Sequence, residues 1–114
     1  MLPLNQALTA CRISHLPMVP CSRISEVLDE TKVDGLLVTS REEEALAIGA
    51  GLVLAGATPL VAMQASGLLN SLNSLGSLAV AYRLPLLLFV SMRGSLVDKN
   101  LTQAPGYRVV AGAV

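Results

Sequence analysis

The sequence predicts an α/β fold, in which a doubly wound, mostly parallel sheet carries helices on both faces. Three observations lead to this prediction. Four short segments are rich in apolar residues, as expected of strands that are buried on both faces of a sheet. Segments with apolar residues at helical spacing and helix-starting residues at their heads alternate with these strands. Such an alternation is typical of βαβ units, in which consecutive strands run parallel.

The first half of the chain is expected to hold a helix, a strand, a second helix and a second strand, over residues 4–10, 13–19, 23–31 and 36–39. Pro20 ends the first strand. Ser22 is expected to cap the second helix, because it stands directly before apolar residues at helical spacing. Asp34 and Gly35 form the turn that precedes the second strand.

The second half is expected to hold a helix, a strand, a helix and a strand, over residues 41–55, 59–63, 68–82 and 85–90. Ser40 and Glu43 have the spacing of a capping box, and Gly56 stands where a helix ends. Gly49 and Gly51 lie in mid-helix, so close packing explains them better than a dinucleotide-binding fingerprint does. Beyond residue 94 the pattern fades, and the domain is expected to be short at its C-terminal end.

The chain of 114 residues is expected to form a single domain over residues 1–114, with one core. Hydrophobic residues make up 53% of it and charged residues only 14%, and its mean hydropathy is +0.62. This composition indicates that the chain is buried on several sides, either by a membrane or by another subunit.

A membrane span is the less favoured of these two explanations. Residues 45–82 carry no charge, which is long enough for a spanning helix. However, Pro59 divides the stretch, its second half is rich in Ser and Asn, and no aromatic belt flanks it. Buried α/β strands produce the same hydropathy, so we expect no membrane span.

The charge and cysteine content argue against several other classes of protein. The net charge is zero and Lys and Arg form no cluster, so no nucleic-acid partner is expected. Cys11 and Cys21 form no CxxC pair and His15 is the only histidine, which argues against a zinc site. Both thiols are expected to be buried apolar residues in a reducing cytoplasm, and the N-terminus lacks the basic region of a signal peptide.

Ligands of open α/β sheets bind at the carboxyl ends of the strands, where helix N-termini point. Three strand-to-helix connections of this kind are expected, at residues 20–22, 39–42 and 64–70. In the third, the backbone amides together with Gln64, Ser66, Asn70 and Asn73 are suited to hold an anion. Ordinary helix capping by Ser66 is the alternative.

Glu42, Glu43 and Glu44 open the helix expected at residues 41–55. The helix dipole stabilises negative charge there, so solvated residues at a helix start explain all three carboxylates. Alternatively, one of them is a buried acid with a chemical task. Glu43 is expected to complete the capping box and Glu44 to be solvated, which leaves Glu42 without an assigned partner.

Three stretches together resemble the pyrimidine-binding domain of thiamine-diphosphate enzymes. They are REEEALAIGAG at residues 41–51, MQASGLLNSLNSL at 63–75 and YRLPLLLFVSMRG at 82–94. The resemblance extends to a tail motif, QAPG, at residues 103–106, and it is greatest to the alpha subunits of sulfopyruvate decarboxylases. Phosphonopyruvate decarboxylases come next, but they tend to have Asp at the position of Cys21.

The resemblance implies roles for individual residues. The family's cofactor-activating glutamate lies nine positions before a glycine that corresponds to Gly51, and it therefore matches Glu42. Such a glutamate is buried, hydrogen-bonds N1′ of the aminopyrimidine of thiamine diphosphate, and favours the imino tautomer that deprotonates the thiazolium ring. The implied cofactor-binding residues are Glu42, Gln64, Ser66, Gly67 and Asn70, and the implied substrate-binding residues are Ser22 and Asn70.

The function implied is that of the alpha-type subunit of a thiamine-diphosphate-dependent 2-oxo acid decarboxylase, which converts sulfopyruvate to sulfoacetaldehyde and CO2. The sequence has no GDG motif followed by an Asn-rich stretch, which in this family holds magnesium and the diphosphate. The resemblance therefore implies a beta-type partner subunit that carries the motif. It also implies a hetero-oligomer with the active site at the interface, and an alpha chain that is inactive by itself.

One residue departs from the family pattern. The helix-opening loop commonly reads SGLGN, whereas here Leu69 replaces the second glycine and adds bulk where a backbone approaches the ligand. Two alternatives therefore stand beside the main interpretation. One is a catalytically inactive α/β module of the same fold that binds a partner, and the other is an enzyme similar to phosphonopyruvate decarboxylase.

Overall fold

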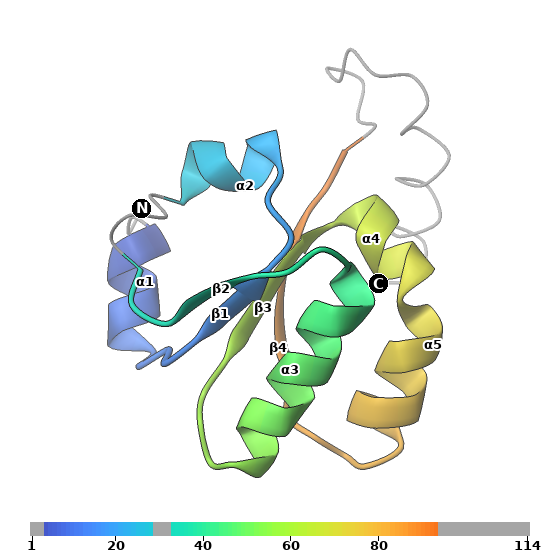
Figure 1. The fold of residues 1–114 in the computed structure, drawn as a ribbon. Helices are drawn as coiled ribbons and strands as arrows, with labels where there is room; N and C mark the ends of the chain where they lie inside the picture. The colour runs from blue at the N-terminus through green and yellow to red at the C-terminus, as the bar shows by residue number, and fades with distance from the viewer. Residues whose placement is uncertain (1–3, 29–32, 94–114) are drawn as a thin grey trace.

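The structure is a computed structural model that describes residues 4–28 and 33–93. Four parallel strands form one sheet in the order β2-β1-β3-β4 (Figure 1). They are β1 (Leu16–Met18), β2 (Leu36–Val38), β3 (Leu60–Gln64) and β4 (Leu87–Ser91). The predicted α/β class with a parallel sheet is confirmed, although β1 is shorter than predicted. The predicted tail motif at residues 103–106 lies outside the described residues.

The described helices are α1 (Leu4–Ala10), α2 (Ser22–Val27), α3 (Glu42–Leu54), α4 (Ala65–Asn70), α5 (Leu72–Ser74) and the π-helical η2 (Leu75–Val80). The single helix predicted at residues 68–82 is wrong, because this region begins at Ala65 and is divided into α4, α5 and η2. Ser71 lies at the first division, where its buried hydroxyl donates a hydrogen bond to the carbonyl oxygen of Gly67. A back-bond of this kind often bends helices.

Each face of the sheet has its own core, because consecutive residues of β3 point to opposite faces. Leu60 and Ala62 pack in a cluster with residues of α1 and α2. Val61 and Met63 pack in a second cluster with residues of α3 and of the helices that follow β3. Helices therefore cover both faces of the sheet, as predicted (Figure 1).

All four described strands end at the same edge of the sheet, because they are parallel. β1 pairs with β2 on one side and with β3 on the other, so the order of the strands reverses between β1 and β3. The carboxyl ends of strands at such a reversal form the usual ligand crevice of open α/β sheets. The three predicted strand-to-helix connections follow β1, β2 and β3 at this edge.

The glycines of α3 differ in their surroundings. Gly49 is buried, and a Cβ added to it would lie 2.5 Å from Cγ2 of Val61 in β3, so its predicted role in close packing is confirmed. The same prediction is wrong for Gly51, which is exposed. A Cβ added to Gly51 would have no neighbouring atom within 4 Å. Gly56, with a φ of 85°, follows the end of α3 in the left-handed conformation that the sequence predicts.

The charge-free stretch at residues 45–82 does not form one long helix. It contributes most of α3, all of β3 and the three helical segments after it. Within residues 4–28 and 33–93, no helix is both long and apolar enough to cross a membrane.

Both cysteines are free thiols. Cys11 is exposed just beyond the end of α1, so the prediction that it is buried is wrong. Cys21 is half-buried between β1 and α2, as a small apolar residue at the edge of a core.

Candidate active site

Thr39 ties the start of α3 to the carboxyl edge of the sheet. Its buried hydroxyl lies 3.2 Å from the carbonyl oxygen of Met18, the last residue of β1, and 3.2 Å from that of Arg41. Its backbone N–H also donates a hydrogen bond of 2.8 Å to the Met18 carbonyl. This single side chain therefore holds the first turn of α3 beside the ends of β1 and β2.

The three glutamates at the start of α3 have three different environments. Arg41 is the N-cap and makes no side-chain capping bond, so the predicted capping box of Ser40 and Glu43 is wrong. Glu44 instead accepts a hydrogen bond of 3.2 Å from the backbone N–H of Ser40, and Glu43 pairs with Arg41 at 3.3 Å. Because the helix starts one residue later than predicted, the glutamate that reaches back is Glu44 rather than Glu43.

Glu42 is the first residue of α3, and it is half-buried. Its side chain packs against Gly67, a buried residue of α4. The three atoms nearest to a Cβ added to Gly67 are Cγ, Cδ and Oε1 of Glu42. This contact brings together the connections that follow β2 and β3, so two of the three predicted strand-to-helix connections meet.

The other residues predicted at the third connection lie around this contact. Gln64 is the last residue of β3, is half-buried, and is paired in register with Ser91 of β4. Ser66 is half-buried in α4, and Asn70 is exposed at the end of that helix. Helix capping by Ser66 is wrong, because α4 begins at Ala65 and its N-cap is Gln64, without a side-chain bond.

Ser22 lies on the other side of the sheet from Glu42. It is exposed and is the first residue of α2, whose N-cap is Cys21, so its predicted capping role is wrong. Because α2 covers the face opposite to α3 and α4, the described contacts do not bring Ser22 to Glu42. Cys21 instead approaches β4, with its Sγ atom 3.6 Å from the Oγ atom of Ser91.

Two residues at this edge were not singled out in the sequence. Ser71 is fully buried and bonds the carbonyl group of Gly67. Ser91 reaches Cys21 across the end of β3. A serine four residues after a glycine, inside an apolar helical stretch, was the available signal for Ser71, and no local signal pointed to Ser91.

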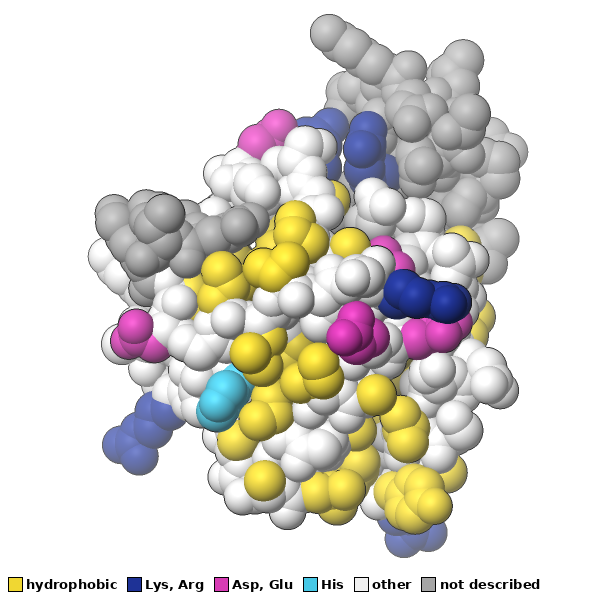
Figure 2. Space-filling view, in the orientation of Figure 1, with side chains coloured by type: hydrophobic (Ala, Val, Ile, Leu, Met, Phe, Trp, Pro, Cys, Tyr) yellow, Lys and Arg dark blue, Asp and Glu magenta, His cyan; other side chains and the backbone are white. Residues whose placement is uncertain are grey.

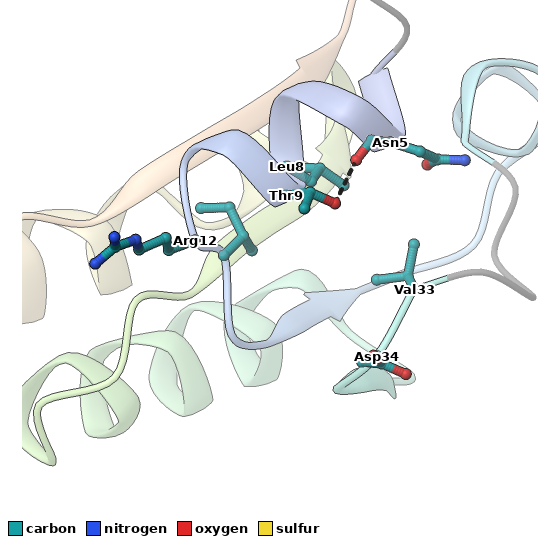
Figure 3. Close-up of a pocket in the computed structure, with 7 residues that line it drawn as sticks. Asn5, Leu8, Thr9, Arg12, Val33 and Asp34 are labelled. Carbon is teal, nitrogen blue, oxygen red and sulfur yellow. Dashed lines mark hydrogen bonds between the residues drawn. The ribbon is translucent and has the colours of Figure 1, made fainter.

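A hollow of about 230 Å³ lies at the opposite edge of the sheet, between α1 and the residues that precede β1 and β2. Its polar lining consists of Asn5, Thr9, Arg12 and Asp34. Figure 3 shows the side chains of Arg12 and Asp34 pointing in different directions. The hydroxyl group of Thr9 donates a hydrogen bond of 3.1 Å to the carbonyl oxygen of Asn5. These polar groups do not converge on a common point, so we do not treat this hollow as the active site.

Within the described part of the chain, no group of three or more His, Cys, Asp or Glu residues is placed to hold a metal ion. The polar groups at the carboxyl edge of the sheet include a half-buried carboxyl group on Glu42, an amide on Gln64 and hydroxyl groups on Ser66 and Ser91. These groups are suited to hydrogen-bond a polar organic ring or a small anion.

The fold and the site together define an α/β protein with a parallel sheet and a half-buried carboxyl group at its carboxyl edge. No protein-family model matches the sequence. The chain is nevertheless similar to several proteins named as the alpha subunit of sulfopyruvate decarboxylase.

Three relatives show the extent of the similarity. The sequence is 37% identical to the subunit of Methanococcus maripaludis over 97 residues, which are 82% of this chain and 58% of the relative. It is 36% identical to that of Methanocaldococcus jannaschii over 107 residues, 91% of this chain and 63% of the relative. It is 40% identical to that of Methanothermobacter thermautotrophicus over 90 residues, 76% of this chain and 54% of the relative.

These similarities confirm the resemblance stated from the sequence motifs. The chain spans between 54% and 63% of the length of these three relatives. The similarity therefore covers most of this chain but only part of each relative.

Proposed function

We propose that this chain acts as the alpha-type subunit of a thiamine-diphosphate-dependent decarboxylase that converts sulfopyruvate to sulfoacetaldehyde and CO2. Glu42 is its catalytic residue. A beta-type partner subunit with a GDG motif binds Mg²⁺ and the diphosphate, and the two subunits form a cytoplasmic hetero-oligomer. The remaining site residues are Gln64, Ser66, Gly67 and Asn70 beside the cofactor, and Ser22 with Asn70 beside the anionic substrate.

The observation that carries this proposal is the contact between Glu42 and Gly67 at the carboxyl edge of the sheet. It occurs in a chain that is 36–40% identical to three proteins named as sulfopyruvate decarboxylase alpha subunits. Those names favour sulfopyruvate over phosphonopyruvate as the substrate.

The chemistry of Glu42 fits an aminopyrimidine ring. A carboxyl group makes a directional hydrogen bond to a ring nitrogen, and a half-buried carboxyl group meets less competition from water than an exposed one. Thiamine diphosphate, when bound, supplies a nucleophilic carbon and an electron sink for decarboxylation. The task of this chain is to orient the ring through Glu42 and to keep water away with the apolar core under α3.

The test is co-expression with a chain that carries the GDG motif, followed by measurement of CO2 release from sulfopyruvate. Glu42→Gln keeps the size of the side chain and removes its ionisable proton. We expect this variant to lower kcat by about 10²–10⁴-fold, the usual contribution of general acid–base catalysis.

Glu43→Gln is the matched control. Glu43 is in the same turn of α3, but its partner is the exposed Arg41, so we expect kcat to stay unchanged. Failure of the assembled complex to bind thiamine diphosphate would contradict the proposal. Binding without turnover would favour the inactive partner-binding module. Turnover of phosphonopyruvate but not of sulfopyruvate would show that the proposed substrate is wrong.

A further inference from the structure

We infer that Gly67 is a positioning residue for Glu42, and that the missing side chain at position 67 determines where the Glu42 carboxyl group lies. For catalysis this inference rests on the proposed function, because only there does the carboxyl group of Glu42 have a chemical task. The geometric part of the inference stands independently of the reaction.

The backbone of α4 does not require a glycine at position 67. Among the glycines in the described residues, only Gly35 and Gly56 have a positive φ, and within a helix alanine is the better helix former. What excludes a side chain is space. All three of the nearest atoms to an added Cβ belong to the side chain of Glu42, at separations shorter than van der Waals contact permits.

The backbone on either side of this contact is anchored. Ser71, which is fully buried, donates a hydrogen bond to the carbonyl oxygen of Gly67, and Ala65 is only 2% exposed at the junction with β3. On the other side, the hydroxyl of Thr39 holds the first turn of α3 to the end of β1. Of the two partners, the side chain of Glu42 is therefore the part that can move.

Glu42 is only half-buried in the first turn of α3, so part of this residue is already exposed to solvent. An alanine at position 67 would therefore turn the carboxyl group of Glu42 outward while the chain stays folded. Glycine at this position keeps that carboxyl group turned inward, against α4.

The test follows the ¹³C resonance of the Glu42 side-chain carboxyl group in the full chain. We expect Gly67→Ala to move this resonance toward that of Glu43. Gly76→Ala is the control, because Gly76 is an exposed helical glycine whose added Cβ would meet nothing within 4 Å. It should leave the Glu42 resonance unchanged. An unchanged Glu42 resonance in Gly67→Ala would overturn the inference.

A second comparison covers the case in which Gly67→Ala does not fold. The double variant Glu42→Ala with Gly67→Ala lacks the side chain with which the new methyl group collides, so we expect it to fold as Glu42→Ala does. If Glu42→Ala folds and the double variant does not, the inference is wrong. Neither measurement uses turnover, so failure of the proposed function would leave this test intact.

Discussion

At the scale of single residues, Glu42, Glu43 and Glu44 show how neighbouring acids acquire different tasks. The helix dipole stabilises a carboxylate anywhere in this first turn, so position alone does not distinguish them. Their partners do. Glu43 lies beside the guanidinium group of Arg41, Glu44 accepts a hydrogen bond from a backbone N–H, and Glu42 packs against α4. This interhelical contact makes Glu42 the candidate for chemistry.

Ser71 carries the first prediction at this scale. Ser71→Ala removes a buried hydroxyl and leaves the carbonyl group of Gly67 without that donor. We expect the free energy of unfolding to fall by about 1 kcal/mol, the usual net value of such a hydrogen bond, with a range up to about 3 kcal/mol. Urea denaturation monitored by circular dichroism measures this change.

Ser77→Ala is the control for Ser71→Ala. Ser77 is exposed, and its hydroxyl lies at 3.5 Å from the carbonyl oxygen of Ser74, a long hydrogen bond. Its replacement should change the free energy of unfolding by less than about 0.5 kcal/mol, as is usual for surface positions. Equal losses in the two variants would contradict the role assigned to Ser71.

At the scale of elements, the helical region after β3 is divided at Ser71, although the spacing of its apolar residues predicts a single helix. The apolar spacing of residues 68–82 predicts one helix, but α4 ends at Asn70 and α5 begins at Leu72. Ser71, between them, directs its hydroxyl back to Gly67 rather than to solvent. The break keeps α4 short and holds Gly67 beside the start of α3.

A pair of glycines tests how α3 packs on the sheet. Gly51→Ala should raise the free energy of unfolding by about 0.5–1 kcal/mol, because alanine is the better helix former and the site is open. Gly49→Ala should lower it by about 1–3 kcal/mol, because the new methyl group would press on Val61 in a packed core. Thermal and urea denaturation measure both. Equal stabilisation by the two variants would show that α3 is not packed tightly against β3.

At the scale of the whole molecule, several large apolar side chains are exposed on the part of the chain that the structure describes. Among the described residues, Leu54, Tyr82 and Val80 are each at least 69% exposed, and Val38 is 61% exposed on β2 at the edge of the sheet. Figure 2 shows apolar side chains at several places across one face. Scattered exposed apolar residues are normal, but a partner subunit, as in the proposed function, would bury a surface of this kind.

We therefore expect this chain, when purified alone, to self-associate, because the proposed partner subunit that would cover these exposed apolar side chains is then absent. Sedimentation velocity at several concentrations measures this, with an average mass above the 11.9 kDa of the monomer that rises with concentration. Co-expression with a chain that carries the GDG motif should replace the mixture with one defined complex. A single monomeric species at all concentrations would contradict this expectation.

The sequence by itself determined the class of fold and the edge of the sheet on which the candidate site lies. Short apolar segments alternating with helices leave few arrangements other than a covered parallel sheet, and parallel strands all end at one edge. The ends of helices were also readable where local chemistry decides them, as at Gly56. The three acids at the start of α3 were recognisable as a group because they are consecutive in the sequence.

The tertiary structure decided which of these acids faces the interior, where α3 begins and why the helix after β3 is divided. Each outcome depends on residues that are distant in the sequence. Thr39 bonds Met18 across the sheet, and Glu42 meets Gly67 between two helices. Local spacing carries no information about such contacts, since they exist only once β1, β2 and β3 lie side by side and bring their following residues to one edge.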